Sequence, residues 1–343
     1  MSDPFPPLLD VLTRLPGIAG HETQVQEYLL AQLAPLADEA WSDPIGNVIA
    51  RFGDRDAQPG VAILAHMDTL GFLVKRIHED GTLGVVAVGS VNTLALPGAA
   101  VQVGSFPGII GVRAQHLAQA GDTLPDIDDL YIQIDPAAIP QIEITTPVIY
   151  APQTIHLGDR WYASPYLDNR AGCAVLLEVA RWLQQAALPY TVYVIATVQE
   201  ETTCAGAMCA LQAVKPSQAI FIDGTLTYDT PETRRWGAVR LGGGPVLTAY
   251  LYISGLNGWH ADPRLRAYFK QQAAQAGIPF QQDAIHGLMS DARVSTWLGI
   301  PSTLIGLPVR GKHGPLEIMH LDDLSHAVRL LASALPGMAA GFI

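Results

Sequence analysis

The sequence of 343 residues is poor in charge and in cysteine. Only 15% of its residues are charged and 49% are hydrophobic, which excludes a largely disordered chain. Its three cysteines form no paired framework, which excludes a disulfide scaffold and is typical of a reducing compartment. The longest uncharged stretch, residues 81–112, is interrupted by Gly, Pro, Ser, Asn and Gln. We therefore expect no membrane-spanning helix there.

Basic residues are also scarce. The net charge is −12, from 20 basic and 32 acidic residues, and no basic cluster occurs. We therefore expect no nucleic-acid partner, while the acidity mildly favours substrates that carry positive charge. The first residues lack a basic segment followed by an apolar one, so we expect no secretory signal and a cytoplasmic location.

The predicted secondary structure changes in character twice along the chain. Residues 61–65 are typical of a buried strand, residues 171–183 are typical of a helix, and strand-like and helical runs alternate from there on. Between residues 71 and 160, helical periodicity gives way to short β-type runs separated by Gly and Pro. We predict an α/β fold with a mixed central sheet and helices on both faces. Residues 1–70 and 161–343 form this domain, and a β-rich domain of residues 71–160 is inserted into it.

Side chains of the metal-ligand type stand at or near the ends of predicted elements in five places. They are His66 and Asp68 after the strand at 61–65, Asp168 in the run Leu-Asp-Asn-Arg, Glu200 and Glu201 after the strand at 191–197, Asp223 after the strand at 219–222, and His313 after the strand at 303–306. Sites in open α/β sheets form outside the carboxyl ends of the strands. Residues far apart in sequence can therefore meet in one crevice.

Two imidazoles with three or four carboxylates suit Zn²⁺ or a similar divalent ion. This number of ligands exceeds the need of one tetrahedral ion, so we predict two divalent ions per chain, zinc first, with cobalt or manganese as alternatives. Asp168 can bridge the two ions. His66 and Asp223 can complete one site, and Glu201 and His313 the other.

Two carboxylates remain for other roles. Asp68 can accept the second ring N–H of His66, and Glu200 can act as the general base. Taken singly, each residue also has a structural interpretation: Asp168 or Asp223 can cap a helix, and the glutamate pair can be a solvated loop. The five places together favour a metal centre.

Four runs resemble the glutamyl and deblocking aminopeptidase family: Ala65-His66-Met67-Asp68, Leu167-Asp168-Asn169-Arg170-Ala171-Gly172, Val198-Gln199-Glu200-Glu201 and Lys312-His313-Gly314-Pro315-Leu316-Glu317. The resemblance covers nearly the whole chain in the same order. It implies a two-metal exopeptidase whose metal ligands fall on His66, Asp168, Glu201, Asp223 and His313, with Glu200 as the catalytic carboxylate. The pairing of these ligands to each metal ion given above rests on this resemblance. It further implies that the β-rich insertion is a dimerisation domain and that the chain forms homo-oligomers, with twelve-subunit tetrahedral particles known in the family.

The chain departs from the family pattern in three places, one of which is Gly224-Thr225 after Asp223, with Trp236 following. Thr202-Thr203-Cys204-Ala205-Gly206-Ala207 replaces a Gly-Leu-Arg-Gly-Ala type run, and Leu288-Met289-Ser290-Asp291-Ala292 replaces Gly-Gly-Thr-Asp-Ala. The metal ligands are unaffected, so the departures concern substrate preference and assembly size. Apolar residues near His313 predict a pocket for neutral aliphatic side chains. They are Leu288, Met289, Leu307, Pro308 and Val309.

The expected function is that of an aminopeptidase acting on short peptides with free N-termini. A related two-metal deacylase of N-acyl amino acids would use the same metal pair with a different pocket. A catalytically silent assembly scaffold is a third possibility. The presence of Glu200 and of all five ligands opposes the scaffold, which has no need of them.

Overall fold

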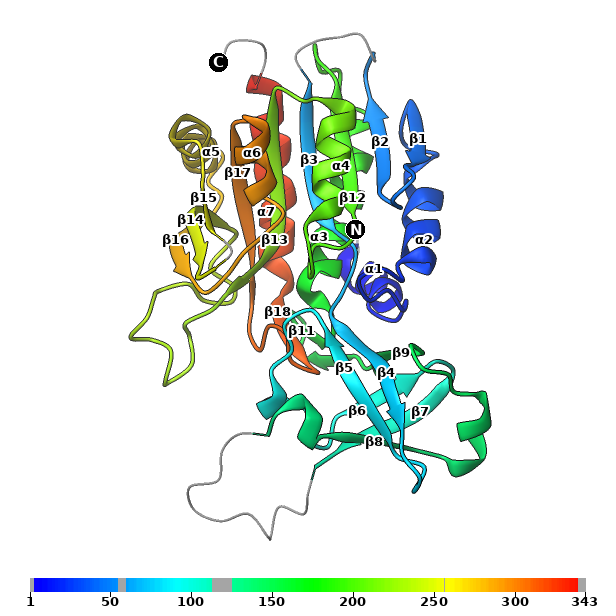
Figure 1. The fold of residues 1–343 in the computed structure, drawn as a ribbon. Helices are drawn as coiled ribbons and strands as arrows, with labels where there is room; N and C mark the ends of the chain where they lie inside the picture. The colour runs from blue at the N-terminus through cyan, green and yellow to red at the C-terminus, as the bar shows by residue number, and fades with distance from the viewer. Residues whose placement is uncertain (1–2, 55–59, 113–124, 256, 339–343) are drawn as a thin grey trace.

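The computed structural model describes residues 3–54, 60–112, 125–255 and 257–338. A large α/β body lies above a smaller β-barrel in Figure 1. The predicted mixed α/β fold with a β-rich insertion is therefore confirmed. Within the described residues, no helix is both long and apolar enough to cross a membrane.

Nine strands of the described chain form the central sheet, in the order β1-β2-β12-β3-β13-β17-β14-β15, with β16 beside β14. The neighbours β12, β3, β13 and β17 run parallel. The strand β2 is antiparallel to β1 and β12, and β14 is antiparallel to β17 and β15 but parallel to β16. Every residue of β3, β12 and β17 is buried, as expected for strands covered on both faces. The strands are β1 (Glu39–Ser42), β2 (Val48–Phe52), β3 (Val61–His66), β12 (Val192–Thr197), β13 (Gln218–Leu226), β14 (Val246–Ile253), β15 (Asn257–His260), β16 (Gln281–His286) and β17 (Ser302–Val309).

Helices cover both faces of this sheet. Successive side chains of a strand point to opposite faces, so Ile63 packs in the core shared with α1, α2, α3, α5 and α7, and Leu64 packs in the core shared with α4 and α6. The helices are α1 (Phe5–Leu12), α2 (Thr23–Leu33), α3 (Leu167–Leu183), α4 (Ala205–Val214), α5 (Pro263–Gln275), α6 (Arg293–Leu298) and α7 (Leu321–Ala334). A short 3-10 helix, η5 (Leu335–Gly337), follows α7.

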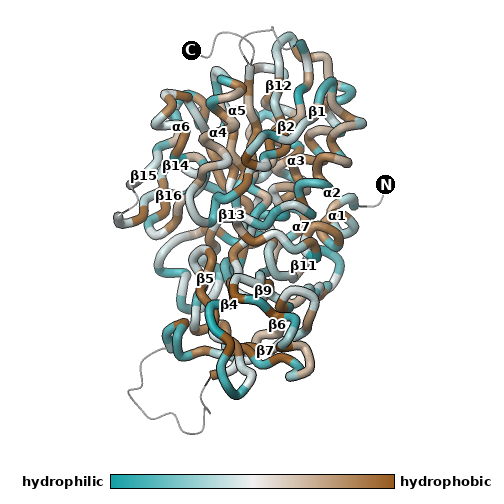
Figure 2. The backbone as a smooth tube through the Cα atoms, turned by 45° about the vertical axis from the view of Figure 1, so that its right-hand side comes forward, coloured by the Kyte–Doolittle hydropathy of each residue, from teal (hydrophilic) through white to brown (hydrophobic). Residues whose placement is uncertain are grey.

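The insertion is a closed barrel in the order β4-β5-β8-β7-β6-β9, with its own apolar core around Phe72 and Ile132. Hydrophobic and hydrophilic stretches alternate along it in Figure 2. The strands are β4 (Gly71–Ile77), β5 (Leu83–Val88), β6 (Ala100–Val103), β7 (Phe106–Gly111), β8 (Tyr131–Ile134) and β9 (Pro147–Tyr150), and the short helices are η1 (Thr93–Ala95), η3 (Ile127–Asp129) and η4 (Pro136–Gln141).

A third sheet combines two strands that follow the barrel in the chain with one strand that precedes α7. It consists of β10 (Ile155–Leu157), β11 (Trp161–Ser164) and β18 (Glu317–His320), in that order. The pairing of β11 with β18 brings Ser164 opposite Glu317. It therefore joins the segment that leads into α3, where Asp168 lies, to the segment that follows β17, where His313 lies.

Candidate metal centre

The parallel strands point their carboxyl ends at the barrel, because β3 runs directly into β4 (Figure 1). His66 is the last residue of β3 and lies opposite Thr197, the last residue of β12. Asp223 lies inside β13, which continues to Leu226, and not after the strand as predicted. The register of β13 with β3 ends with Phe221 opposite Leu64, two residues before Asp223 and His66, and the Asp223 Oδ1 to His66 Nε2 distance is 3.5 Å.

The pair Glu200 and Glu201 stands in a turn. The strand β12 ends at Thr197, as predicted, and Gln199 has a left-handed φ of 58°. The backbone N–H groups of Glu200 and Glu201 donate to the two carboxylate oxygens of Asp68, at 3.0 and 3.1 Å. The turn lets both glutamates face the same region although they are adjacent in sequence.

Asp68 is fully buried and touches His66 as well as the glutamate pair. Its carboxylate Oδ1 lies 3.5 Å from His66 Nδ1, and its backbone carbonyl lies closer to the same nitrogen, at 3.2 Å. One residue therefore orients the His66 ring and holds the backbone of the glutamate pair.

Asp168 stands at the first turn of α3, in the middle of the site. Its Oδ1 lies 3.7 Å from His66 Nε2, and its Oδ2 lies 3.4 Å from His313 Nε2. Its backbone N–H donates to Glu317 Oε2 at 2.8 Å. The two carboxylate oxygens thus face two different imidazoles, which is the arrangement that a bridging ligand needs.

His313 lies in the turn between β17 and β18 and has a left-handed φ of 67°. Its backbone N–H donates to Glu317 Oε1 at 2.7 Å. Its ring Nδ1 lies 2.8 Å from the carbonyl oxygen of Ser90, in the barrel segment after β5, so Nδ1–H donates to that carbonyl. The ring then presents Nε2 to Asp168 and, at 3.6 Å, to Glu201 Oε2.

All seven predicted site residues meet here. Three groups of potential ligand atoms each lie within 4.8 Å of one another: His66, Asp168 and Asp223; Asp168, Glu201 and His313; and His66, Glu200 and Glu201. The first two groups share Asp168 and match the predicted pair of sites. The third shows that Glu200 also lies within reach of a ligand position.

The donor set fits divalent cations. Apart from the ion pair of Asp168 Oδ2 with Lys312, the buried oxygens Asp168 Oδ1 and Oδ2, Glu201 Oε1 and Asp223 Oδ1 have no hydrogen-bond partner among the described residues. Buried polar atoms are nearly always paired, so converging carboxylates without hydrogen-bond partners fit a site that binds a cation. Imidazole and carboxylate together suit zinc and its neighbours.

The electrostatics agree with this interpretation. Burial raises the pKa of Glu200 well above its ordinary value, and neighbouring carboxylates raise it further. Burial likewise raises the pKa of Glu201, to about 6. Burial also acts to raise the pKa of Asp168, but the ammonium group of Lys312 and the two imidazoles outweigh it and hold that pKa well below the ordinary value.

Three further buried charged residues were not assigned from the sequence. Lys312 forms the ion pair with Asp168, and Glu317 accepts the backbone N–H groups of Asp168 and His313. Asp291 accepts the Thr197 hydroxyl at 2.6 Å, and burial raises its pKa to about 7. Lys312 and Glu317 lie in a run that resembles the family, but only the fold shows where their side chains point.

The five apolar residues predicted to line one specificity pocket do not come together, and the preference for neutral aliphatic side chains stays a prediction. Leu288 packs in the core on the α4 and α6 face, whereas Leu307 and Val309 pack in the core on the α3 and α7 face. Leu307 and Val309 are alternate residues of β17 and therefore point to the same face of the sheet. Leu288 packs on the other face, so the sheet lies between it and these two residues.

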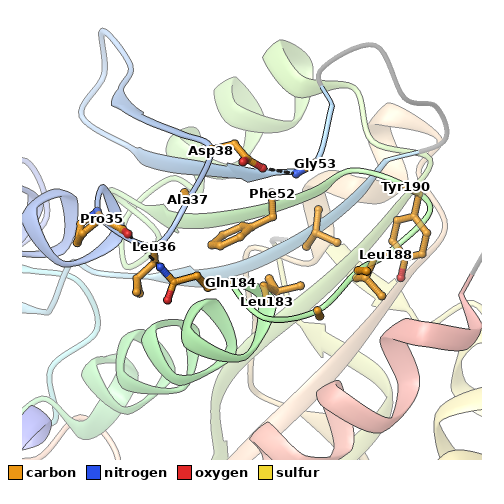
Figure 3. Close-up of a pocket in the computed structure, with 13 residues that line it drawn as sticks. Pro35, Leu36, Ala37, Asp38, Phe52, Gly53, Leu183, Gln184, Leu188 and Tyr190 are labelled. Atoms are coloured by element: carbon orange, nitrogen blue, oxygen red, sulfur yellow. Dashed lines mark hydrogen bonds between the residues drawn. The ribbon is translucent and has the colours of Figure 1, made fainter.

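A hollow elsewhere in the chain lies far from this chemistry. Figure 3 shows it between Phe52 at the end of β2 and Leu183 at the end of α3, with Asp38 hydrogen-bonded to the N–H of Gly53. Val192, the first residue of β12, also lines it. It therefore lies at the amino end of β12, whereas Glu200 follows the carboxyl end of that strand.

Comparisons with known proteins agree with the site. Residues 46–330 match the model of the M42 glutamyl aminopeptidase family. The chain is 29% identical to a lysyl aminopeptidase of Pyrococcus furiosus over 344 residues, covering 96% of each chain. Its fold resembles an aminopeptidase from Desulfurococcus kamchatkensis, with a TM-score of 0.89, 26% identity and coverage of 96% of this chain and 94% of the other. It also resembles the TET1 peptidase of Pyrococcus horikoshii, with a TM-score of 0.84, 26% identity and coverage of 96% and 98%. The chain belongs to the M42 glutamyl aminopeptidase family and is a metal-dependent aminopeptidase.

Proposed function

We propose that this aminopeptidase uses two divalent cations to remove N-terminal residues from short peptides. The observation that supports the proposal most directly is the shared carboxylate of Asp168, whose two oxygens face two separate groups of ligands. His66, Asp168 and Asp223 would hold one cation, and Asp168, Glu201 and His313 the other. Zinc suits the donors best, with cobalt or manganese as alternatives. When bound, the cations would polarise the scissile carbonyl and acidify the attacking water.

Glu200 is proposed as the general base. Its carboxylate Oε2 lies 3.8 Å from His66 Nε2, and its side chain is only 10% exposed. There it can accept a proton from the attacking water and deliver it to the leaving amine nitrogen. Burial raises its pKa above the ordinary value, so this carboxylate accepts a proton more readily than an exposed glutamate does.

Asp68 is proposed as a positioning residue. Because it holds the N–H groups of Glu200 and Glu201, it keeps the base and one metal ligand in a fixed relation to His66. A displacement of about 1 Å of reacting groups is enough to cost about a hundredfold in rate. Such a clamp therefore supports turnover without touching the substrate.

The test compares leucyl, lysyl and glutamyl dipeptides that have free N-termini with the same dipeptides after N-acetylation. Protein stripped of metal and refilled separately with Zn²⁺, Co²⁺ and Mn²⁺ is assayed for released amino acid. We expect release only from the free dipeptides. Release only from the acetylated ones would support the deacylase instead, and a fully metallated protein inactive on both sets would support the scaffold.

We also propose that the barrel joins subunits into a homo-oligomer. Large apolar side chains are exposed on it, among them Leu94 at 61% and Ile109 at 57%. Exposed apolar side chains on one domain can be buried by a second copy of the chain, and contacts between like chains usually close into symmetric assemblies. The Pyrococcus horikoshii relative is described as able to assemble into a tetrahedron or a large octahedral shell. The twelve subunits of a tetrahedral particle are our proposal for this chain.

A further inference from the structure

Lys312 is a buried cation inside the candidate metal centre that the proposed reaction does not use. Lys312 lies in the turn that follows β17, and its side chain is 7% exposed. Its ammonium group donates to the carbonyl oxygen of Gly224 at 3.1 Å and forms an ion pair with Asp168 Oδ2. The ammonium group also forms a longer ion pair with Asp223 Oδ1, at 3.8 Å.

The ammonium group lies on one side of the bridging carboxylate. Asp168 Oδ2 is the oxygen that faces His313, whereas Oδ1 faces His66. A cation held by Asp168, Glu201 and His313 must therefore share Oδ2 with the charge of Lys312. A cation held by His66, Asp168 and Asp223 can use Asp168 Oδ1, and the charge of Lys312 reaches that group only through the longer ion pair with Asp223 Oδ1.

We propose that Lys312 makes the Asp168–Glu201–His313 group the weaker and more readily exchanged of the two cation sites. The inference rests on the two-cation function proposed above and concerns this chain's own lysine. Like charges at close range repel strongly in a medium of low dielectric constant, and the Gly224 carbonyl keeps the ammonium group beside Asp168. Full occupancy of the centre then depends on the concentration of free metal.

The experiment is calorimetric titration of the metal-stripped full-length protein with Co²⁺, which reads out binding and not activity. The variants are Lys312→Met, which removes the charge, and Lys312→Gln, which removes it but retains a donor for the Gly224 carbonyl. Lys75→Met is the matched control, because Lys75 is an ion-paired lysine of the barrel with a side chain that is 56% exposed. Circular dichroism and thermal melting of each variant verify that it is folded.

We expect two Co²⁺ per chain in the wild type with unequal affinities. Both Lys312 variants should tighten the weaker site at least about tenfold and change the stronger site less than about threefold, whereas Lys75→Met should change neither. In a His313→Ala background, which removes a ligand of the weaker site, Lys312→Met should change the remaining site less than about threefold, as a double-mutant cycle requires.

Two results would overturn the inference, and they differ from each other. If folded Lys312→Met and Lys312→Gln proteins keep the wild-type ratio of the two affinities, or show a weakened second site, Lys312 does not set that ratio. If the wild type itself binds fewer than two Co²⁺ per chain, the two-cation function fails, and this inference fails with it.

Discussion

Substitution of Gly224 by alanine tests the bridging role of Asp168 without altering any proposed ligand. Gly224 follows Asp223 within β13, and its φ is not in the left-handed region, so alanine is compatible with the backbone there. A Cβ at this position would lie 2.5 Å from Asp168 Oδ1, whereas ordinary contact begins at 3.4 Å. The carboxylate would have to retreat by the difference, about 0.9 Å.

Asp168 has little freedom to make that movement. Its backbone N–H is held by Glu317, its Oδ2 is paired with Lys312, and the residue is only 3% exposed. We therefore expect an overpacking cost of about 1–3 kcal/mol in unfolding free energy. A ligand displaced by about 1 Å should lower kcat/KM about a hundredfold and weaken metal binding by about 10–100-fold.

The assay combines metal titration, urea unfolding and kcat/KM on a free dipeptide at saturating metal. Gly60→Ala is the matched control, because its Cβ would lie 3.3 Å from the nearest atom, on Tyr193, at the opposite end of β3. The control should keep nearly wild-type values. If Gly224→Ala binds two metal ions with wild-type affinity and turns over normally, Asp168 does not bridge the ions.

Three more expected outcomes concern the general base, a buried acid and the barrel surface. Glu200→Gln keeps the shape of the side chain but removes the proton acceptor. The value of kcat should therefore fall about a hundredfold to ten-thousandfold while the metal content stays unchanged. Normal turnover of the fully metallated variant would show that the base is another residue. Asp323 accepts the N–H groups of Gly242 and Gly244, and burial raises its pKa from 3.8 to about 6. The folded state therefore binds the proton more tightly than the unfolded state, and between about pH 4 and 6 this residue's stabilisation falls by about 3 kcal/mol as the pH rises. Urea unfolding should show this decline in the wild type relative to Asp323→Asn, and parallel pH profiles would contradict it. Ile109→Asp on the barrel should reduce the particle mass measured by light scattering, whereas Val11→Asp on α1 should not; Val11 is also an exposed apolar residue, at 40% against 57% for Ile109. An unchanged mass for Ile109→Asp would exclude that part of the barrel as an interface.

Much of the fold follows from local patterns in the sequence. The buried run at 61–65 became β3, and the predicted helix at 171–183 became most of α3. Burial on both faces imposes continuous apolar runs on such strands, and the run alone reveals them.

The strand β16 was not predicted, because most of its residues are polar. Ile285 is its only buried residue, and the other five are exposed or half-buried. A strand of this composition at the edge of the sheet has no apolar alternation by which the sequence could reveal it.

The sequence by itself determined which residue types follow the strands, and the tertiary structure decided how they face one another. His66, Glu200 and Glu201 could be predicted because each ends or closely follows a buried strand whose carboxyl end is part of the site. Asp223 reaches His66 only through the register of β13 with β3, and Lys312 reaches Asp168 only through the turn after β17. Strand pairing and side-chain direction depend on contacts between distant segments, which no local pattern encodes. For the same reason the sequence showed that Leu307 and Val309 are apolar, but only the sheet decided that they belong to the core and not to a pocket.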